Sequence, residues 1–445
     1  MRRLGPVLMC LLGCGDDRSA QPINLVRTLG VEGVATLPAD KVRAVALAGI
    51  DARTFVVVRA TTQGADFCPQ CLDPDSTDCG AICRRAVLEV SRLRTNGASD
   101  PPSRFHEAFP VTASYDVDGI DVVALDATHA GVAWLECDDA TCGPSLARQS
   151  CTARYTTVDL LTGRHGSIET LYQGWYGELR LAFDPRARQL LALVGTQLAS
   201  GVGVRAAIYD EQGAVLLSPW QAYGGRDATA PAATASAQGF VIVADDPAPS
   251  QPGPAEPCTE ACDCLTSGAP ELATGGLYAF WPGVVRPAER ISPGRGAEGT
   301  YVPREVIAAI EAGDRVVVAS SGAVDGVAEL FEPAVGGWTR RHSSQAPLPM
   351  WLGALGDATH LAWLGCDLDP DSRAVHHLVA GAVLVGKAEQ RDEIMALDAG
   401  DMVRTAPVHE DDGVTTTFVL RRVPAPAGNG ATSAHFEVLA IRAAW

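Results

Sequence analysis

The stretch ALDATHAGVAWLECD, residues Ala124–Asp138, returns as ALGDATHLAWLGCD at Ala354–Asp367. The two copies share the segments DATH and AWLxCD. Each copy has an apolar segment, a polar turn and a second apolar segment, which is the pattern of a β-hairpin buried on both faces. An internal repeat of this kind indicates a fold that is assembled from similar units.

Weaker copies of the hairpin occur along the whole chain. They lie at Val42–Ala60, Leu179–Gln197, Pro231–Asp245, Glu305–Ser320 and Glu393–Val408. Most units continue into a second hairpin with a glycine turn, at Arg154–Ser167, Arg205–Leu217, Val327–Arg340 and His376–Val385. Four short antiparallel strands per unit, repeated around a ring, form a β-propeller. We therefore expect an all-β fold, a β-propeller of four-stranded antiparallel blades, with seven blades favoured over six or eight.

Two alternatives to this interpretation stay open. The same strands could form a β-sandwich or two separate β domains. The segments Glu305–Gly313 and Ala388–Leu397 could also be short helices, but their place in the repeat favours strands.

One unit, Asp314–Arg341, resembles a kelch repeat. Its apolar strand is followed by an aromatic residue, Phe331, a Gly-Gly turn and then Trp338, while Ser320 and Ser321 stand where a kelch repeat has a glycine pair. The resemblance implies a β-propeller and is specific over this unit only. The segment Asp159-x-x-Thr162-Gly163 would suit propellers of the quinoprotein type equally well.

The charge balance argues against one class of partner. The chain of 445 residues has 35 Lys and Arg against 53 Asp and Glu, a net charge of −18, and its only lysines are Lys41 and Lys387. Nucleic-acid binding needs Lys and Arg that neutralise phosphates. We therefore expect no nucleic-acid partner.

The N-terminus has the layout of a signal peptide. Arg2 and Arg3 precede an apolar run from Leu4 to Leu12, which is too short to span a membrane. The segment Leu11-Leu12-Gly13-Cys14 resembles the lipobox of bacterial lipoproteins. The resemblance implies cleavage before Cys14 and acylation of its thiol. In the resemblance, the residue after the modified cysteine influences sorting between the two membranes. Gly15 at that position favours the outer membrane over the inner membrane.

This gives a simple division of the chain. Residues 1–13 are the lipoprotein signal peptide, residues 14–21 are a polar tether after the lipidated Cys14, and residues 22–445 are a single propeller domain. The domain carries cysteine-rich loop insertions at 61–84, 137–151 and 245–275. The expected location is the bacterial cell envelope, with the N-terminal lipid as the link to the membrane.

An exported chain meets an oxidising compartment, so its cysteines indicate disulfides before metal ligands. The expected disulfide cysteines are Cys68, Cys71, Cys79, Cys83, Cys137, Cys142, Cys151, Cys258, Cys262, Cys264 and Cys366. The first four should pair among themselves, and zinc is the alternative there because four thiolates suit a tetrahedral ion. The chain has 13 cysteines, and 11 remain when Cys10 of the signal peptide and the lipidated Cys14 are left out. Because 11 is odd, one thiol should be free or paired to another molecule.

The repeat also predicts on which face each group lies. Every cysteine cluster falls between the second and third strands of a unit, and antiparallel strands reverse at every turn. Residues expected together on one face are Cys71, Cys142, Cys262 and Cys366, and those expected on the opposite face are His129, His360, Gly163 and Gly336.

The motif search favours a non-enzymatic role. The chain has no Gly-x-Ser-x-Gly elbow, no glycine-rich phosphate loop and no His-Glu-x-x-His pair. We expect no catalytic residue, cofactor or metal, and predict an envelope lipoprotein that binds a protein or glycan through its loop face. The alternatives are a hydrolase or lyase acting on polysaccharide, with Asp245, Asp246 or Glu136 near the central channel, and a scaffold in outer-membrane protein assembly.

Overall fold

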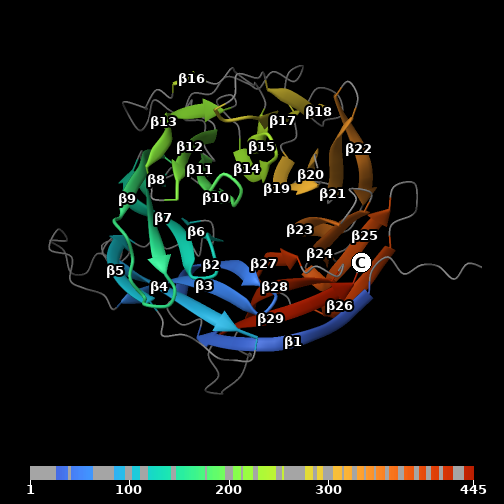
Figure 1. Cartoon of the computed structure of the whole chain (residues 1–445), viewed down its shortest axis with the longest axis horizontal. Coiled ribbons are helices and arrows are strands. Elements are labelled where there is room, and N and C mark those ends of the chain that lie inside the picture. Colours follow the sequence, from blue (N-terminus) through green and yellow to red (C-terminus); the bar gives the residue numbers. More distant parts are fainter. Residues whose placement is uncertain are drawn as a thin grey trace, which may run out of the picture.

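The computed structural model is a ring of β-sheets (Figure 1). It describes residues 27–38, 42–63, 85–95, 103–110, 119–141, 147–175, 178–195, 204–211, 214–223, 229–246, 253–254, 276–283, 288–293, 304–312, 315–322, 328–334, 337–344, 347–355, 360–368, 375–384, 390–396, 402–409, 414–423 and 435–444. In this part of the chain no helix is long and apolar enough to cross a membrane. The strands of these residues form seven antiparallel sheets.

The first four sheets follow the chain in order, except that one short strand of blade 3 comes from the segment between two strands of blade 4. Blade 1 contains β2 (Val42–Asp51), β3 (Thr54–Gln63), β4 (Arg85–Arg94) and β5 (Ser103–Pro110). Blade 2 contains β6 (Ile120–Ala124), β7 (His129–Thr141), β8 (Ala147–Asp159) and β9 (Glu169–Trp175). Blade 3 contains β10 (Glu178–Asp184), β11 (Gln189–Gly195), β12 (Val204–Asp210), β13 (Val215–Tyr223) and β16 (Gly253–Pro254). Blade 4 contains β14 (Thr229–Ser236), β15 (Gly239–Asp246), β17 (Gly276–Phe280) and β18 (Glu289–Pro293).

The remaining sheets complete the ring. Blade 5 contains β19 (Arg304–Ala312), β20 (Arg315–Gly322), β21 (Ala328–Ala334) and β22 (Gly337–Ser344). Blade 6 contains β23 (Pro347–Leu355), β24 (His360–Leu368), β25 (Val375–Leu384) and β26 (Gln390–Ala396). Blade 7 contains β27 (Met402–His409), β28 (Val414–Val423), β29 (His435–Ala444) and β1 (Arg27–Pro38).

The first strand of each blade lies at the centre of the ring (Figure 1). These inner strands contact one another in a closed circuit, in which β2 meets both β6 and β27. The all-β propeller predicted from the repeat is therefore confirmed. The described residues of the segments Glu305–Gly313 and Ala388–Leu397 lie in strands β19 and β26, as their place in the repeat predicted.

Two of the predicted hairpins are wrong. The segment Glu393–Val408 was expected to be the first hairpin of a unit, but it joins the outer strand of blade 6, β26, to the inner strand of blade 7, β27. His376–Val385 was expected to turn at a glycine, but it lies in the single strand β25, where Gly381 pairs with Trp363. Both errors have one cause, because a glycine or polar residue between apolar segments does not reveal whether the chain turns there or continues.

Blade 7 is closed by the two ends of the described chain. Strand β1 pairs with β29 from Arg27↔Ala444 to Pro38↔His435. Ala35 and Leu37 of β1 pack against the cluster that contains Phe436. The outer strand of the last blade therefore comes from the opposite end of the sequence.

Strand β3 shows why the hairpins are apolar on both faces. Its residues Phe55, Val56, Val57 and Val58 are all fully buried. Phe55 and Val57 belong to the cluster shared with blade 7, whereas Val56 and Val58 belong to the cluster shared with blade 2. Because successive side chains of a strand point to opposite faces, each strand packs against both neighbouring blades. Burying a side chain of this size stabilises the fold by about 1.5–3 kcal/mol.

The kelch-like tryptophan also joins two blades. Trp338 begins the outer strand of blade 5 and packs beside the cluster that contains Ile291 of blade 4. Its indole Nε1 donates a hydrogen bond to Glu289 Oε2 at 3.2 Å. The large ring and its polar N–H thus fix the outer edges of two neighbouring blades.

Candidate functional site

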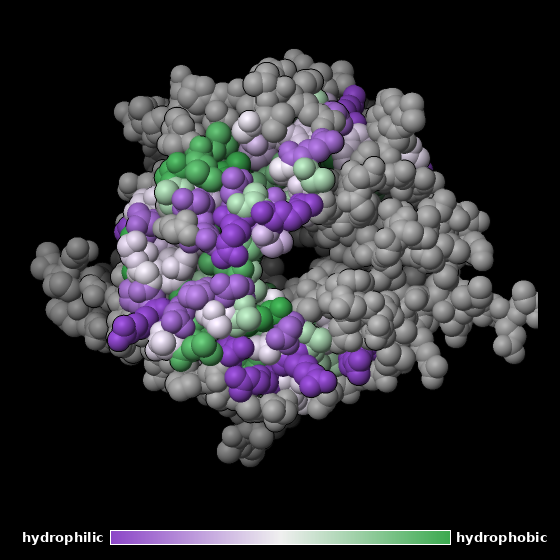
Figure 2. Space-filling view, in the orientation of Figure 1, coloured by the Kyte–Doolittle hydropathy of each residue, from purple (hydrophilic) through white to green (hydrophobic). Residues whose placement is uncertain are grey.

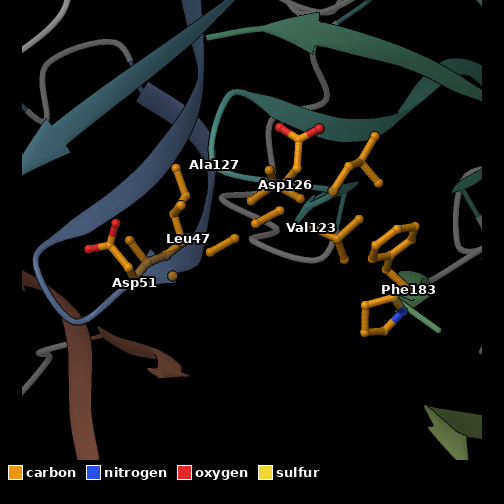
Figure 3. Close-up of a pocket in the computed structure, with 13 residues that line it drawn as sticks. Leu47, Asp51, Val123, Asp126, Ala127 and Phe183 are labelled. Carbon is orange, nitrogen blue, oxygen red and sulfur yellow. The ribbon is translucent and has the colours of Figure 1, made fainter. Parts of the chain in front are cut away.

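A cavity of about 630 Å³ opens where the inner strands of blades 1, 2 and 3 end (Figure 3). Its lining is mainly apolar and consists of Leu47, Ala48, Gly49, Ile50, Asp51, Val122, Val123, Ala124, Leu125, Asp126, Ala127, Phe183 and Pro185. Figure 2 shows that the molecule is hollowed at the centre of the ring, with hydrophilic side chains at the edge of the hollow. The cavity therefore lies at one mouth of the central channel.

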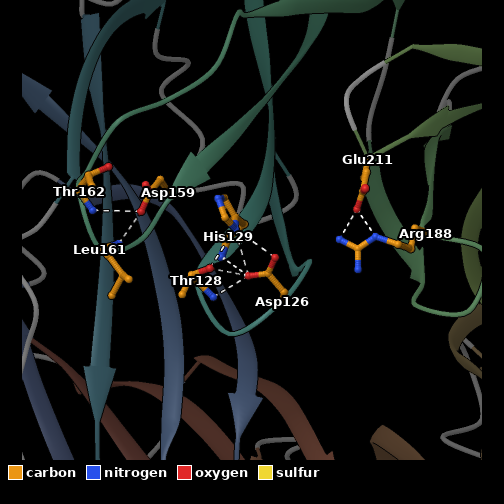
Figure 4. A network of polar contacts seen from close by, with 8 residues as sticks. All are labelled: Asp126, Thr128, His129, Asp159, Leu161, Thr162, Arg188 and Glu211. Atoms are coloured by element: carbon orange, nitrogen blue, oxygen red, sulfur yellow. Dashed lines mark hydrogen bonds and ion pairs between the residues drawn. The ribbon is translucent and has the colours of Figure 1, made fainter.

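Two carboxylates at this mouth cap the turns that follow the inner strands. Asp51 Oδ1 accepts a hydrogen bond from the backbone N–H of Arg53 at 2.7 Å. Asp126 Oδ1 accepts from the backbone N–H groups of Thr128 and His129 at 2.7 and 2.8 Å, and from the Thr128 hydroxyl at 2.8 Å (Figure 4). An Asp side chain that bonds the backbone two residues ahead forms an Asx turn. The DATH segment of the repeat is thus a turn motif.

The histidine of this motif belongs to the same turn. His129 Nδ1 lies 3.0 Å from Asp126 Oδ2. Burial raises the pKa of Asp126, but the hydrogen bonds from Thr128 and His129 and the attraction of His129 outweigh it and lower the pKa to about 2. At neutral pH this carboxylate is ionised, so it accepts hydrogen bonds and has no proton to donate.

Asp side chains also accept hydrogen bonds from backbone N–H groups in the turns that follow the third strands of blades 2 and 3. Asp159 Oδ1 accepts from the backbone N–H groups of Leu161 and Thr162 at 2.9 and 3.0 Å, and the hydrogen bonds from Thr162 lower its pKa. Gly163 completes that turn with a φ of 73°, which favours glycine. Asp210 Oδ1 accepts from the backbone N–H of Ala214 at 2.7 Å. We call this edge of the ring, where first strands turn into second strands and third into fourth, the turn face.

An ion pair crosses the turns of blade 3. Arg188, which follows the inner strand, pairs with Glu211, which follows the third strand (Figure 4). Arg188 has a φ of 52°, in the left-handed region that L-residues rarely adopt. This pair therefore connects two successive turns of one blade on the turn face.

The opposite edge is the insertion face, where second strands connect to third strands. The connections there include residues 64–84, 142–146, 247–275 and 369–374. Strand β16, within the third of these, pairs with β13 of blade 3 through Gln221↔Pro254 and Ala222↔Gly253. That insertion leaves blade 4 and reaches the outer edge of its neighbour.

The predicted site residues fall on these elements as follows. Cys137 lies in β7, Cys151 in β8 and Cys366 in β24, while His129 and His360 begin second strands at the turn face. Outside the described residues lie Cys14, Cys68, Cys71, Cys79, Cys83, Cys142, Cys258, Cys262, Cys264 and Gly336. The pairing of the cysteines stays a prediction.

The carboxylates proposed for a polysaccharide enzyme do not lie on inner strands. Asp245 and Asp246 end the second strand of blade 4, and Asp245 is only 2% exposed. Glu136 lies in the second strand of blade 2. Sequence reasoning missed Asp51 and Asp126, which line the channel mouth. Their signal was an Asp directly after an apolar strand, followed by a short polar turn.

Potential metal ligands are dispersed over the described part of the chain. There, no group of three or more His, Cys, Asp or Glu side chains is placed to hold a metal ion. The channel mouth is lined mainly by apolar side chains, with the carboxylates of Asp51 and Asp126 as hydrogen-bond acceptors among them.

Comparisons with known proteins support the fold. No family model matches the chain, and no curated protein matches it. An ulvan lyase, described as a new family of polysaccharide lyase, has a TM-score of 0.50 at 7% identity, over 93% of this chain and 95% of that chain. A protein of unknown function from Dyadobacter fermentans has a TM-score of 0.46 at 11% identity, over 94% of this chain and 100% of that chain. The likeness to the ulvan lyase concerns the propeller architecture alone.

Proposed function

We propose that this chain is a cell-envelope lipoprotein, anchored through Cys14, whose propeller binds a protein or a glycan through its insertion face without catalysis. The observation that carries the proposal is the common position of the long insertions. The two long connections, 64–84 and 247–275, both join second strands to third strands. Loops held together by a rigid scaffold are the usual site of recognition in repeat proteins.

The start of β1 is compatible with such an anchor. Arg27 pairs with Ala444 at the turn-face end of β29, and Pro38 lies at the other end. The thirteen residues from Cys14 to Val26 can span at most about 45 Å. A lipid on Cys14 would therefore connect the membrane to the turn-face end of β1, and the insertion face is the edge of the ring opposite that end.

The two carboxylates at the channel mouth are hydrogen-bonded within their own turns. A glycosidase needs one carboxyl group that is protonated at working pH and a second that is ionised. Asp126 has its pKa lowered to about 2, and Asp51 is hydrogen-bonded to the backbone of its own turn. Both carboxylates at this mouth hold turns in place, which supports the non-enzymatic proposal.

Replacing Cys14 by Ala tests the anchor. The parent protein should sediment with membranes, because the acyl chains attached at this residue supply the anchor and more than one chain is needed for stable binding. The Cys14→Ala protein should lose that fraction and become soluble or stay unprocessed. Fractionation and immunoblotting measure this, with Cys10→Ala as the matched control. Equal membrane association of parent and Cys14→Ala would contradict the anchor.

Shortening the insertion of blade 4 tests the binding face. Asp246 and Gly276 are directly paired, so an Asn-Gly turn can replace residues 247–275 without separating the strands. We expect the variant to melt within about 3 °C of the parent, because the blade cores stay intact, and to lose at least about ten-fold of its capture of envelope proteins or array glycans. Pull-down from a solubilised envelope extract and a glycan array are the two measurements.

A control and a rival assay complete that experiment. The double variant Arg188→Ala, Glu211→Ala changes the turn face and should keep the capture unchanged. Unchanged capture by the shortened variant would place the site elsewhere. Incubation with a uronic-acid polysaccharide, followed by ultraviolet absorbance of the unsaturated product, tests the lyase alternative, and product formation would overturn the non-enzymatic proposal.

A further inference from the structure

The central hairpin of blade 2 places two cysteines opposite each other. Strands β7 and β8 pair without a register shift from His129↔Asp159 to Thr141↔Ala147, and Cys137 pairs with Cys151 in this ladder. The two residues are separated by thirteen others in the sequence, and Cys142 lies among these. The register alone therefore selects one pair from three neighbouring cysteines.

The hydrogen-bond pattern shows what kind of pair this is. Leu160 N donates to Thr128 O at 2.7 Å, so residues 128 and 160 occupy a hydrogen-bonded position of the ladder. Hydrogen-bonded and non-hydrogen-bonded positions alternate along antiparallel strands. Nine residues further along β7, Cys137 and Cys151 therefore occupy a non-hydrogen-bonded position. Cα atoms at such a position are about 4.5 Å apart, within the range of about 4.4–6.8 Å that a disulfide requires.

The surroundings of the pair in the ladder are also suitable. Ala133↔Tyr155 and Leu135↔Ala153 precede it in the same row, and these four residues belong to the buried cluster between blades 2 and 3. Gly174 of β9 stands next to Cys151 in the ladder and has no side chain. On the other side of β7, pairing with β6 ends at Ile120↔Trp134, three residues before Cys137. The pair thus lies in the three-stranded part of the blade, just before β7 and β8 continue as a two-stranded ribbon from Asp139↔Gln149.

We propose that Cys137 and Cys151 form a disulfide that links β7 to β8 at the start of this ribbon, on the side of the insertion face. The proposal rests on the proposed function in one respect, because only an exported chain meets the oxidant. That oxidant is the disulfide of a thiol oxidase in the cell envelope. A thiolate attacks that disulfide and the second cysteine resolves the mixed disulfide. Two thiols lose two protons and two electrons, and the oxidant leaves as a dithiol. A two-stranded ribbon is marginally stable alone, so the bond holds its strands in register up to Thr141 and Ala147.

Peptide mapping tests the pair directly. Trypsin cuts after Arg148 and Arg154, and the protease Asp-N cuts before Asp138, which separates Cys137 from Cys142. Without reduction, the mature protein should yield peptide 126–137 linked to peptide 149–154, lighter by two hydrogens than the two reduced peptides together. The Cys142→Ser variant should keep this linked peptide, whereas Cys137→Ser and Cys151→Ser should lose it completely. A link from Cys142 to either residue would overturn the proposal, and free thiols at both are interpreted with the reoxidised chain described next.

A second experiment tests the pairing of the two cysteines independently of the proposed export. Chain purified in reduced form and reoxidised with glutathione disulfide should form the same linked peptide. If it forms there but not in the protein taken from cells, the pairing stands and the proposed envelope location fails. If it forms in neither preparation, the pairing is wrong.

Discussion

A chain without residues 1–38 should fail to form a stable ring. The deletion removes β1, so the outer edge of β29 loses its ladder from Arg27↔Ala444 to Pro38↔His435. The hydrogen bonds of that ladder contribute about 0.5–1.5 kcal/mol each, and the contacts of Ala35 and Leu37 with the blade 7 cluster are lost as well. We expect the melting temperature to fall on the order of 10 °C, or the protein to aggregate through the exposed edge. Circular dichroism and light scattering measure the two outcomes.

A matched truncation shows whether β1 itself is responsible. Removing only residues 1–26 leaves β1 in place and should leave the melting temperature of the soluble domain unchanged. A synthetic peptide of residues 27–38, added in excess to the longer truncation, should recover part of the lost stability by pairing with β29. Equal melting of the two truncations would show that blade 7 does not depend on its N-terminal strand.

Phe55→Ala should be among the most destabilising single substitutions. Phe55 of blade 1 is fully buried, and its ring centroid lies 4.7 Å from that of Phe418 in blade 7. Truncating a buried Phe to Ala costs about 3–5 kcal/mol, because it removes apolar burial and leaves a cavity. Urea denaturation of the two proteins measures the difference. A loss below about 1 kcal/mol would contradict the packing of blades 1 and 7.

Two further variants separate the ring contact from a general loss of apolar surface. Leu161→Ala removes a side chain that is 53% exposed on the turn face, and its effect should stay within about 0.5 kcal/mol. A double-mutant cycle of Phe55→Ala and Phe418→Ala should give a coupling energy of about 0.5–1.5 kcal/mol, as expected for neighbouring aromatic rings. Additive effects would argue against direct contact between the rings.

The repeat predicted the blades well because each strand carries its own signal. The apolar run Phe55–Val58 is buried on both faces, and such runs can be recognised without knowledge of the partner strand. Connections between blades carry no comparable signal. The polar residues between β26 and β27 resemble those inside a hairpin, so Glu393–Val408 was assigned to one unit instead of two. The role of β1 was equally invisible, because its partner β29 lies more than 390 residues away in the sequence.

The candidate site was less predictable than the fold. His129, which was expected on the face opposite the cysteine clusters, begins β7 at the turn face, where its Nδ1 contacts Asp126. The channel mouth brings together the ends of three separate strands, so the neighbourhood of Asp51 and Asp126 depends on the closed ring. Pairing of Cys137 with Cys151 needs the register of β7 and β8, which cysteine spacing alone does not provide.

The pairing of β1 with β29 sets the order in which this protein can fold. Apart from β16, which blade 3 receives from the insertion of blade 4, blades 1 to 6 contain only strands that are close in sequence, so each can form as soon as its own segment is available. Blade 7 has a very high contact order, and contacts of that kind slow folding. The entropy of closing so long a loop grows only with the logarithm of its length, so the delay comes mainly from waiting for the last residues of the chain. Until β29 is available, β1 has an open edge that other strands can join, and a chaperone that covers this edge would protect the protein.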